Sequence, residues 1–163
     1  MSNHLILNFR SLGSKPDANI LEFSAVSVDI SDTHVEEIAS YTNCLERQEF
    51  GSMDQDSVFW WLSHHQIYAN WRNSKKVSIG IVADDFARFI RDYTTPATTV
   101  WGNVPRLEET TKSLLSYSTI NTAPKFFADF KTLLIISGAR QHLIVPSSLD
   151  TARLTARWLA EPL

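Results

Sequence analysis

The chain has 163 residues, 44% hydrophobic and 20% charged, which is the size and composition of one folded domain, so we treat residues 1–163 as a single domain. Its formal net charge of −3 argues against broad electrostatic binding of nucleic acid, but it is compatible with binding through bound metal cations. The single cysteine, Cys44, excludes an intramolecular disulfide and a cysteine-based zinc site. No apolar run approaches the ~20 residues of a membrane span, and the first residues lack a signal-peptide pattern, so we expect a cytoplasmic protein without membrane contact.

The first third of the chain predicts strands. The apolar run LILNF at 5–9 is typical of a central strand, and ILEFSAVSVD at 20–29 alternates like a strand with one buried face. The segment between them, 11–19, is dense in turn-forming residues. The stretch HVEEIASYTN at 34–43 is compatible with a strand or a helix, and we assign it as a third strand.

From residue 54 onward the hydrophobic period becomes helical. The expected elements are a helix at 54–71 capped by Asp54 or Asp56, a helix at 80–93, a short strand at 98–103, a helix at 105–115 and an amphipathic helix at 147–160. This order predicts a mixed α/β fold with antiparallel early strands and a later parallel strand that a helical crossover reaches.

Five motifs, in this order, resemble the 3′–5′ exonucleases of the ribonuclease H-like superfamily, and in particular their phage and prophage branch. They are NFRSLGSKPDANILEFSAVSVD at 8–29, FWWLSHH at 59–65, VWGNVPRLE at 100–108, ADFKTL at 128–133 and PSSLDTA at 146–152. The resemblance covers nearly the whole chain and implies a ribonuclease H-like mixed sheet flanked by helices. It also implies a site in which four carboxylates hold two Mg²⁺ or Mn²⁺ ions and a histidine acts as general base.

The site positions at the first strand depart from that family pattern. The first aspartate of the family falls on Asn8, and the glutamate two residues later falls on Arg10. Arg10 puts a fixed positive charge where a divalent cation would lie. We therefore expect no metal at this corner, and we expect Arg10 to pair with Glu108 or Asp150 instead.

The other family positions are also altered. Glu108 keeps a carboxylate at the third position, whereas Thr151 replaces the last aspartate and Pro146 replaces the histidine. The residual candidates for catalysis are Asp129, Asp150 and His142.

These departures predict a catalytically degenerate exonuclease-like protein, a pseudoenzyme of prophage type without a cofactor, which acts by binding. Its partner would be another protein or a nucleic-acid end, with Arg10 as the phosphate contact. The expected binding residues are Arg10, Trp60, Trp61 and Asn103, although an aromatic pair such as Trp60 and Trp61 is also typical of a core. A homodimer through the tryptophan-rich helix is a further expectation. The alternative is an active, Mg²⁺- or Mn²⁺-dependent 3′–5′ exonuclease with a rearranged site.

Overall fold

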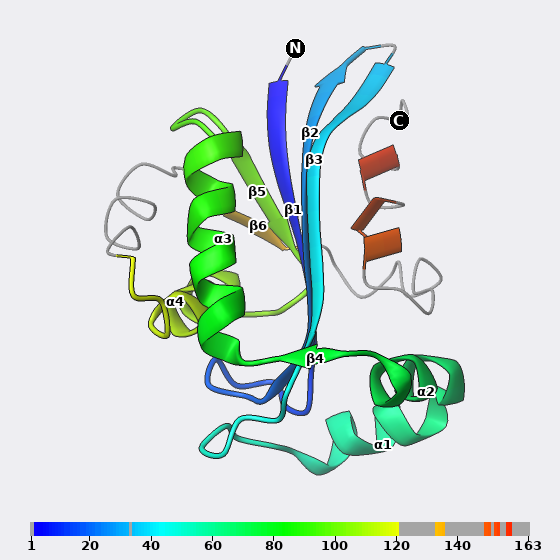
Figure 1. Ribbon diagram of the computed structural model, residues 1–163. Helices are drawn as coiled ribbons and strands as arrows, with labels where there is room; N and C mark the ends of the chain where they lie inside the picture. The colour runs from blue at the N-terminus through cyan, green and yellow to red at the C-terminus, as the bar shows by residue number, and fades with distance from the viewer. Residues whose placement is uncertain are drawn as a thin grey trace.

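Within the part of the chain that the structure describes, a six-stranded sheet forms the centre of the fold (Figure 1). The computed structural model describes residues 2–32, 34–120, 133–135, 149–150, 152–153 and 156–157. The elements are β1 (Ser2–Ser11), β2 (Ile20–Ser31), β3 (His34–Leu45), α1 (Gln55–Ser63), α2 (His65–Asn73), β4 (Lys76–Val77), α3 (Ile79–Tyr93), β5 (Thr99–Gly102), α4 (Leu107–Leu115) and β6 (Leu133–Ile135). None of the described helices is both long and apolar enough to cross a membrane.

The sheet has the mixed topology that the sequence predicts. Its strand order is β4-β3-β2-β1-β5-β6. The first three strands pair in antiparallel fashion, and β5 pairs in parallel with β1 after the crossover through α3. The segment 34–43, for which strand and helix were both open, is strand. The short outer strands β4 and β6 pair in parallel with β3 and β5, and neither was predicted.

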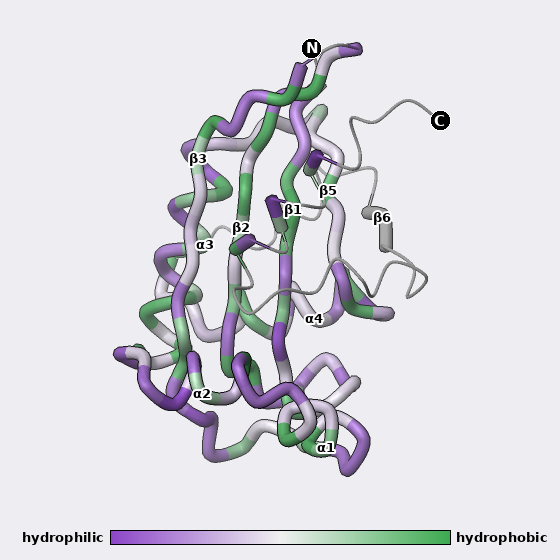
Figure 2. The backbone as a smooth tube through the Cα atoms, turned by 90° about the vertical axis from the view of Figure 1, so that its right-hand side faces the viewer, coloured by the Kyte–Doolittle hydropathy of each residue, from purple (hydrophilic) through white to green (hydrophobic). Residues whose placement is uncertain are grey.

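The two faces of β1 carry different layers. Leu5, Leu7 and Phe9 point into the main core, which α3 covers with residues such as Phe86. Ile6, on the opposite face, packs in a second cluster with Val26, Val28 and two alanines of the C-terminal helical turns, Ala152 and Ala156. Figure 1 shows α3 on one side of the sheet and these turns on the other, and Figure 2 shows hydrophobic stretches along β1 and β2. Asn8 and Arg10 continue the second face, because side chains alternate along a strand.

The prediction of a single helix at 54–71 is wrong, because the helix is interrupted at His64 and the segment forms two shorter helices, α1 and α2. This residue ends α1 and precedes α2 with φ −106° and ψ 73°. The Ser63 hydroxyl donates to the carbonyl of Trp60 at 2.9 Å, and the His64 backbone N–H donates to the same oxygen at 3.1 Å. A hydroxyl that competes for a helical carbonyl favours an end of the helix.

Candidate functional site

The C-terminal end of β1 opens into a pocket of about 260 Å³. Four segments form its walls: the end of β1, the loop after it, α1 and the loop after β5. The parallel pairing of β1 with β5 brings the first and last of these together. The residues that line the pocket include Asn8, Arg10, Ser14, Ser57, Trp60 and Asn103.

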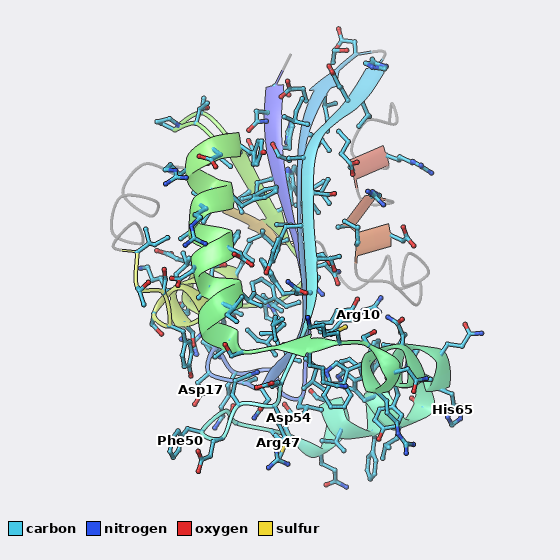
Figure 3. The ribbon with its side chains drawn as sticks, viewed as in Figure 1. Arg10, Asp17, Arg47, Phe50, Asp54 and His65 are labelled. Carbon is cyan, nitrogen blue, oxygen red and sulfur yellow. The ribbon has the colours of Figure 1, made fainter. Side chains whose placement is uncertain are left out.

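Arg10, which is labelled in Figure 3, is buried at this corner. It forms an ion pair with Glu22. Its Nη1 lies 3.5 Å from Oε2 of Glu22, and the two side chains are 4% and 3% exposed. The residues are direct partners in the β1–β2 register, so their side chains share a face of the sheet. Burial lowers the pKa of the Arg10 guanidinium, and the negative charge of Glu22 opposes this change. The corner therefore holds a close pair of opposite charges.

The side chains at this corner do not fit a divalent metal ion. An ion with charge +2 that lay ~4 Å from the guanidinium would be repelled by roughly 8 kcal/mol at an effective dielectric near 20. Glu22 could offset this repulsion only by its own single charge, so the pair gives the ion no net attraction. Mg²⁺ and Mn²⁺ need several negatively charged oxygen ligands. Among the described residues no group of three or more His, Cys, Asp or Glu side chains could hold a metal.

Asn8, two residues before Arg10, is also buried, with 5% of its surface exposed. Its Oδ1 is fully enclosed and accepts no hydrogen bond from any residue that the structure describes. A buried acceptor of this kind costs about 1–3 kcal/mol, so an amide is not the side chain that stability alone would favour here. Among the described residues, Asn8 thus marks the end of β1 as a place with an unsatisfied buried acceptor, and a group of this kind can mark a functional site.

Asn103, which we expected to bind a ligand, instead ties the loop after β5 to β1. Its Oδ1 accepts from the backbone N–H of Phe9 at 2.8 Å, and its Nδ2 donates to the carbonyl of Phe9 at 2.8 Å. The amide of Asn103 therefore makes the same pair of hydrogen bonds to Phe9 that the backbone of a neighbouring β-strand would make. The preceding Gly102 allows this geometry, because a Cβ there would collide with the side chain of Leu107.

The two tryptophans of α1 have different environments. Trp61 is 2% exposed, packs with Leu21 and Ile67, and donates its Nε1–H to the carbonyl of Ser11 at 3.0 Å. It is a core residue and does not line this pocket, so it is not placed to contact a ligand here. Trp60 is half-buried and lines the pocket, and its ring stacks on that of His64 with centroids 4.1 Å apart. Of the pair, only Trp60 presents a ring to a ligand in this pocket.

Asp54 fixes the position of two pocket walls. Its Oδ1 accepts from the backbone N–H of Ser57 at 2.8 Å, which makes it the N-cap of α1, one of the two predicted caps. Its Oδ2 accepts from the backbone N–H of Ser14 at 2.7 Å. These hydrogen bonds lower the pKa of Asp54 to about 2. One carboxylate therefore links α1 to the loop after β1, a role that the sequence did not indicate.

The structure does not bring the expected carboxylates to Arg10. Glu108 lies in the first turn of α4 and pairs with Lys112 at 2.9 Å, and Asp150 lies 3.7 Å from Arg153. The prediction that Arg10 pairs with Glu108 or Asp150 is therefore wrong. The remaining candidates, Asp129, His142, Pro146 and Thr151, lie outside the described residues.

Glu22 is the site residue that the sequence analysis missed. The signal that identifies it is the register of the first hairpin, which places Arg10 opposite Glu22. That register follows from the turn between the strands, in which the Leu12 N–H donates to the Asn19 carbonyl at 2.8 Å. The order of the motifs along the sequence does not reveal that Arg10 and Glu22 are partners.

Three solved structures share the fold. Cell-death related nuclease 4 (CRN-4) matches with a TM-score of 0.59 and 10% identity over 98% of this chain and 63% of that chain. The nuclease domain of 3′hExo, a DEDDh family member bound to rAMP, matches with a TM-score of 0.55 and 10% identity over 98% and 90%. A full-length 3′-exonuclease matches with a TM-score of 0.53 and 8% identity over 98% and 80%. This chain thus spans less than two thirds of CRN-4, and the low identities establish the fold alone.

The sequence comparisons establish the family. No curated protein matches the chain. The family model described as a 3′–5′ exoribonuclease Rv2179c-like domain matches residues 3–155, which is most of the sequence. Together with the folds above, this match shows that the chain belongs to the Rv2179c-like 3′–5′ exoribonuclease domain family, within the ribonuclease H-like exonuclease superfamily.

Proposed function

We propose that this exonuclease-like domain binds the 3′ end of a single-stranded RNA and does not cleave it by two-metal chemistry. The observation that carries the proposal is the buried Arg10–Glu22 ion pair, because it occupies the corner where the family resemblance implies metal-binding carboxylates. Without paired cations at this corner, the water and the leaving oxygen of a phosphodiester lose the stabilisation that two-metal hydrolysis requires.

Three features support a nucleotide as the ligand. The pocket volume of about 260 Å³ suits one nucleotide rather than a folded protein surface. The half-buried ring of Trp60 at its edge can stack on a base, which is worth about 1–3 kcal/mol per base. The structure of 3′hExo, which shares the fold, has rAMP bound. Family membership also favours RNA over DNA.

This proposal changes the role of Arg10. The guanidinium is almost fully buried and paired with Glu22, so it does not serve as the exposed phosphate contact that we expected. Arg10 instead forms part of the buried polar floor of the pocket, where Glu22 holds it in place. Trp60 and the hydroxyls of Ser14 and Ser57 are the groups we assign to ligand contact.

The test uses a 5′-labelled single-stranded RNA of mixed sequence. We expect binding in EDTA and an intact 3′ end after long incubation with millimolar Mn²⁺. Trp60→Ala should weaken binding roughly tenfold through loss of stacking. Phe59→Ala is the matched control, because Phe59 is the preceding aromatic residue, is exposed, and does not line the pocket.

Progressive shortening of the RNA from its 3′ end would show an active exonuclease with a rearranged site. A second experiment tests the reason for inactivity. Asn8→Asp combined with Arg10→Glu would add two carboxylates beside Glu22, and calorimetry should detect Mn²⁺ binding that the wild type lacks. Asn8→Asp alone keeps the ion pair and should bind far less. Equal Mn²⁺ affinity in wild type and double variant would contradict the assigned metal position.

A further inference from the structure

A second pocket, of about 140 Å³, lies between α1, α2 and the ends of the first two strands. All of its lining residues except Arg47 are hydrophobic, and three are the aromatic residues Trp61, Tyr68 and Trp71. The pocket has no polar lining atoms that are open to a ligand. A nucleobase would leave its polar edge unsatisfied there, whereas one aliphatic or aromatic side chain would not.

The apolar surface continues outside this pocket along α1. Leu62, which lines the pocket, is 53% exposed, and Phe59, one turn earlier, is 56% exposed. Residues three apart on a helix are neighbours, so the two side chains form one exposed apolar strip. Contiguous exposed apolar surface beside a pocket is typical of a protein interaction site.

Cations lie in the pocket wall and along the adjacent helix α2 and the residues after it. Arg47 lines it directly, and Lys76 holds its Nζ 4.7 Å from the ring centroid of Trp71. Arg72 lies one turn after Tyr68 on α2, and Lys75 follows that helix. None of these four forms an ion pair with any residue that the structure describes, although Glu46 and Glu49 flank Arg47 in the sequence.

This arrangement differs from the rest of a net-negative chain. The segment 65–78 contains Arg72, Lys75 and Lys76 and no Asp or Glu. In contrast, several cations elsewhere on the described surface have carboxylate partners, such as Arg88 with Asp85 and Arg91 with Asp92. The excess of positive charge is thus local to α2 and the residues after it, on one side of the apolar pocket, and it complements a ligand with both an apolar group and negative charge.

We propose that this second pocket is a docking site for an acidic segment of a partner protein. The segment presents one leucine- or phenylalanine-sized side chain to the pocket, and its flanking carboxylates meet Arg47, Arg72 and Lys76. An apolar anchor in a preformed pocket supplies most of the affinity, and the charges set the orientation and the choice of partner. The site is separate from the pocket at the end of β1, which Trp60 rather than Trp61 lines.

The test is a selection of random twelve-residue peptides displayed on phage against the wild-type chain. We expect enriched peptides to share a Leu, Phe or Met flanked by Asp or Glu. Arg47→Glu and, separately, Leu62→Asp should each weaken binding of the selected peptides roughly tenfold or more. Both positions are exposed, so the fold should tolerate both changes. Arg157→Glu is the matched control, because Arg157 is exposed, forms no ion pair with a described residue and does not line this pocket.

Three results would overturn the proposal: no enriched pattern, an enriched pattern without acidic residues, or selected peptides that bind the Arg47→Glu and Leu62→Asp variants as well as the wild type. A single-stranded RNA that displaces the selected peptides would assign the surface to nucleic acid instead. Failure of peptide docking leaves the RNA-binding test at the first pocket unaffected, because that test measures RNA binding and Trp60 lines the first pocket but not the second.

Discussion

Two arginine–glutamate pairs in this molecule have the same chemistry and opposite surroundings. Arg10 and Glu22 are 4% and 3% exposed, with a shortest N–O distance of 3.5 Å. Arg153 of the C-terminal helical turns and Glu37 of β3 are 38% and 39% exposed, yet their distance is 2.8 Å. We expect the fold to depend more on the longer pair, because water screens the exposed pair far more strongly than the buried one.

The comparison shows that burial, not distance, decides how much a change at an ion pair matters. Breaking a buried pair leaves one uncompensated charge inside the protein, whereas breaking an exposed pair returns both groups to water. At the end of β1, a buried arginine such as Arg10 therefore needs a counter-charge such as Glu22.

The largest expected effect comes from Glu22→Gln. It leaves the Arg10 charge buried without its ionic partner and should lower the free energy of unfolding by about 3–5 kcal/mol. Glu37→Gln should lower it by less than about 1 kcal/mol. Urea denaturation of both variants measures the difference. Equal losses would show that the corner is open to water.

The next effect is a rescue. Arg10→Met combined with Glu22→Leu removes both buried charges and should recover most of the stability that Glu22→Gln loses, because apolar replacement of a buried pair is often neutral or better. Thermal unfolding of the double variant, of Arg10→Met alone and of Glu22→Leu alone gives the coupling energy between the two side chains. A double variant less stable than either single one would mean that Arg10 and Glu22 act mainly through other neighbours.

A smaller effect concerns salt. The coupling energy between Arg153 and Glu37 should be at most about 1 kcal/mol in dilute buffer and fall toward zero near ~1 M NaCl. The coupling energy between Arg10 and Glu22 should change little over the same range. Double-mutant cycles at both salt concentrations provide the measurement, and an equally salt-sensitive buried pair would contradict the burial described above.

The smallest expected effect is the pH response of His4, whose imidazole is partly buried. The Trp101 Nε1–H donates to Nδ1 of His4 at 2.9 Å, which requires the neutral imidazole. Burial lowers the pKa of His4, opposed by Asp29. Its contribution to stability is therefore complete above the unfolded-state value of about 6.5 and is lost as the pH falls through the lower folded-state value.

Denaturation midpoints between about pH 7.5 and pH 5 should show this loss in the wild type. The variant His4→Gln has no group that titrates at this position and should show a flatter profile. Identical slopes in the two proteins would assign the pH dependence to other residues.

Much of the fold could be predicted from the sequence because its signals are local. A short apolar run identified β1, alternation identified β2, and the order of the expected strands and helices predicted the parallel strand β5. The break at His64 was not predictable from hydrophobic period, since it depends on how the Ser63 hydroxyl and the His64 backbone share one carbonyl. The short strands β4 and β6 exist only through pairing with distant neighbours.

The contacts at the end of β1 could not be predicted from the sequence. The family resemblance predicted that acidic residues are replaced there, and the functional role of that corner stays a prediction. The partner of Arg10 depended on hairpin register, and the role of Asn103 depended on where the loop after β5 passes the backbone of Phe9. Trp60 and Trp61 are neighbours in the sequence, but their exposure differs. Successive side chains of a helix point about 100° apart, and the way α1 packs on the sheet decides which of the two is buried.

The hydrogen bonds of Asn103 and Asp54 have a consequence for protein engineering. Asn103 holds its pocket wall through the backbone of Phe9, and Asp54 accepts from the backbone N–H groups of Ser14 and Ser57. The Ser14 hydroxyl adds a longer hydrogen bond to Asp54 at 3.2 Å. Exchange of the side chains at positions 14 and 57 therefore leaves the backbone hydrogen bonds to Asp54 in place. If the first pocket binds an RNA end as proposed, a library at these positions is the way to search for variants with other ligand preferences.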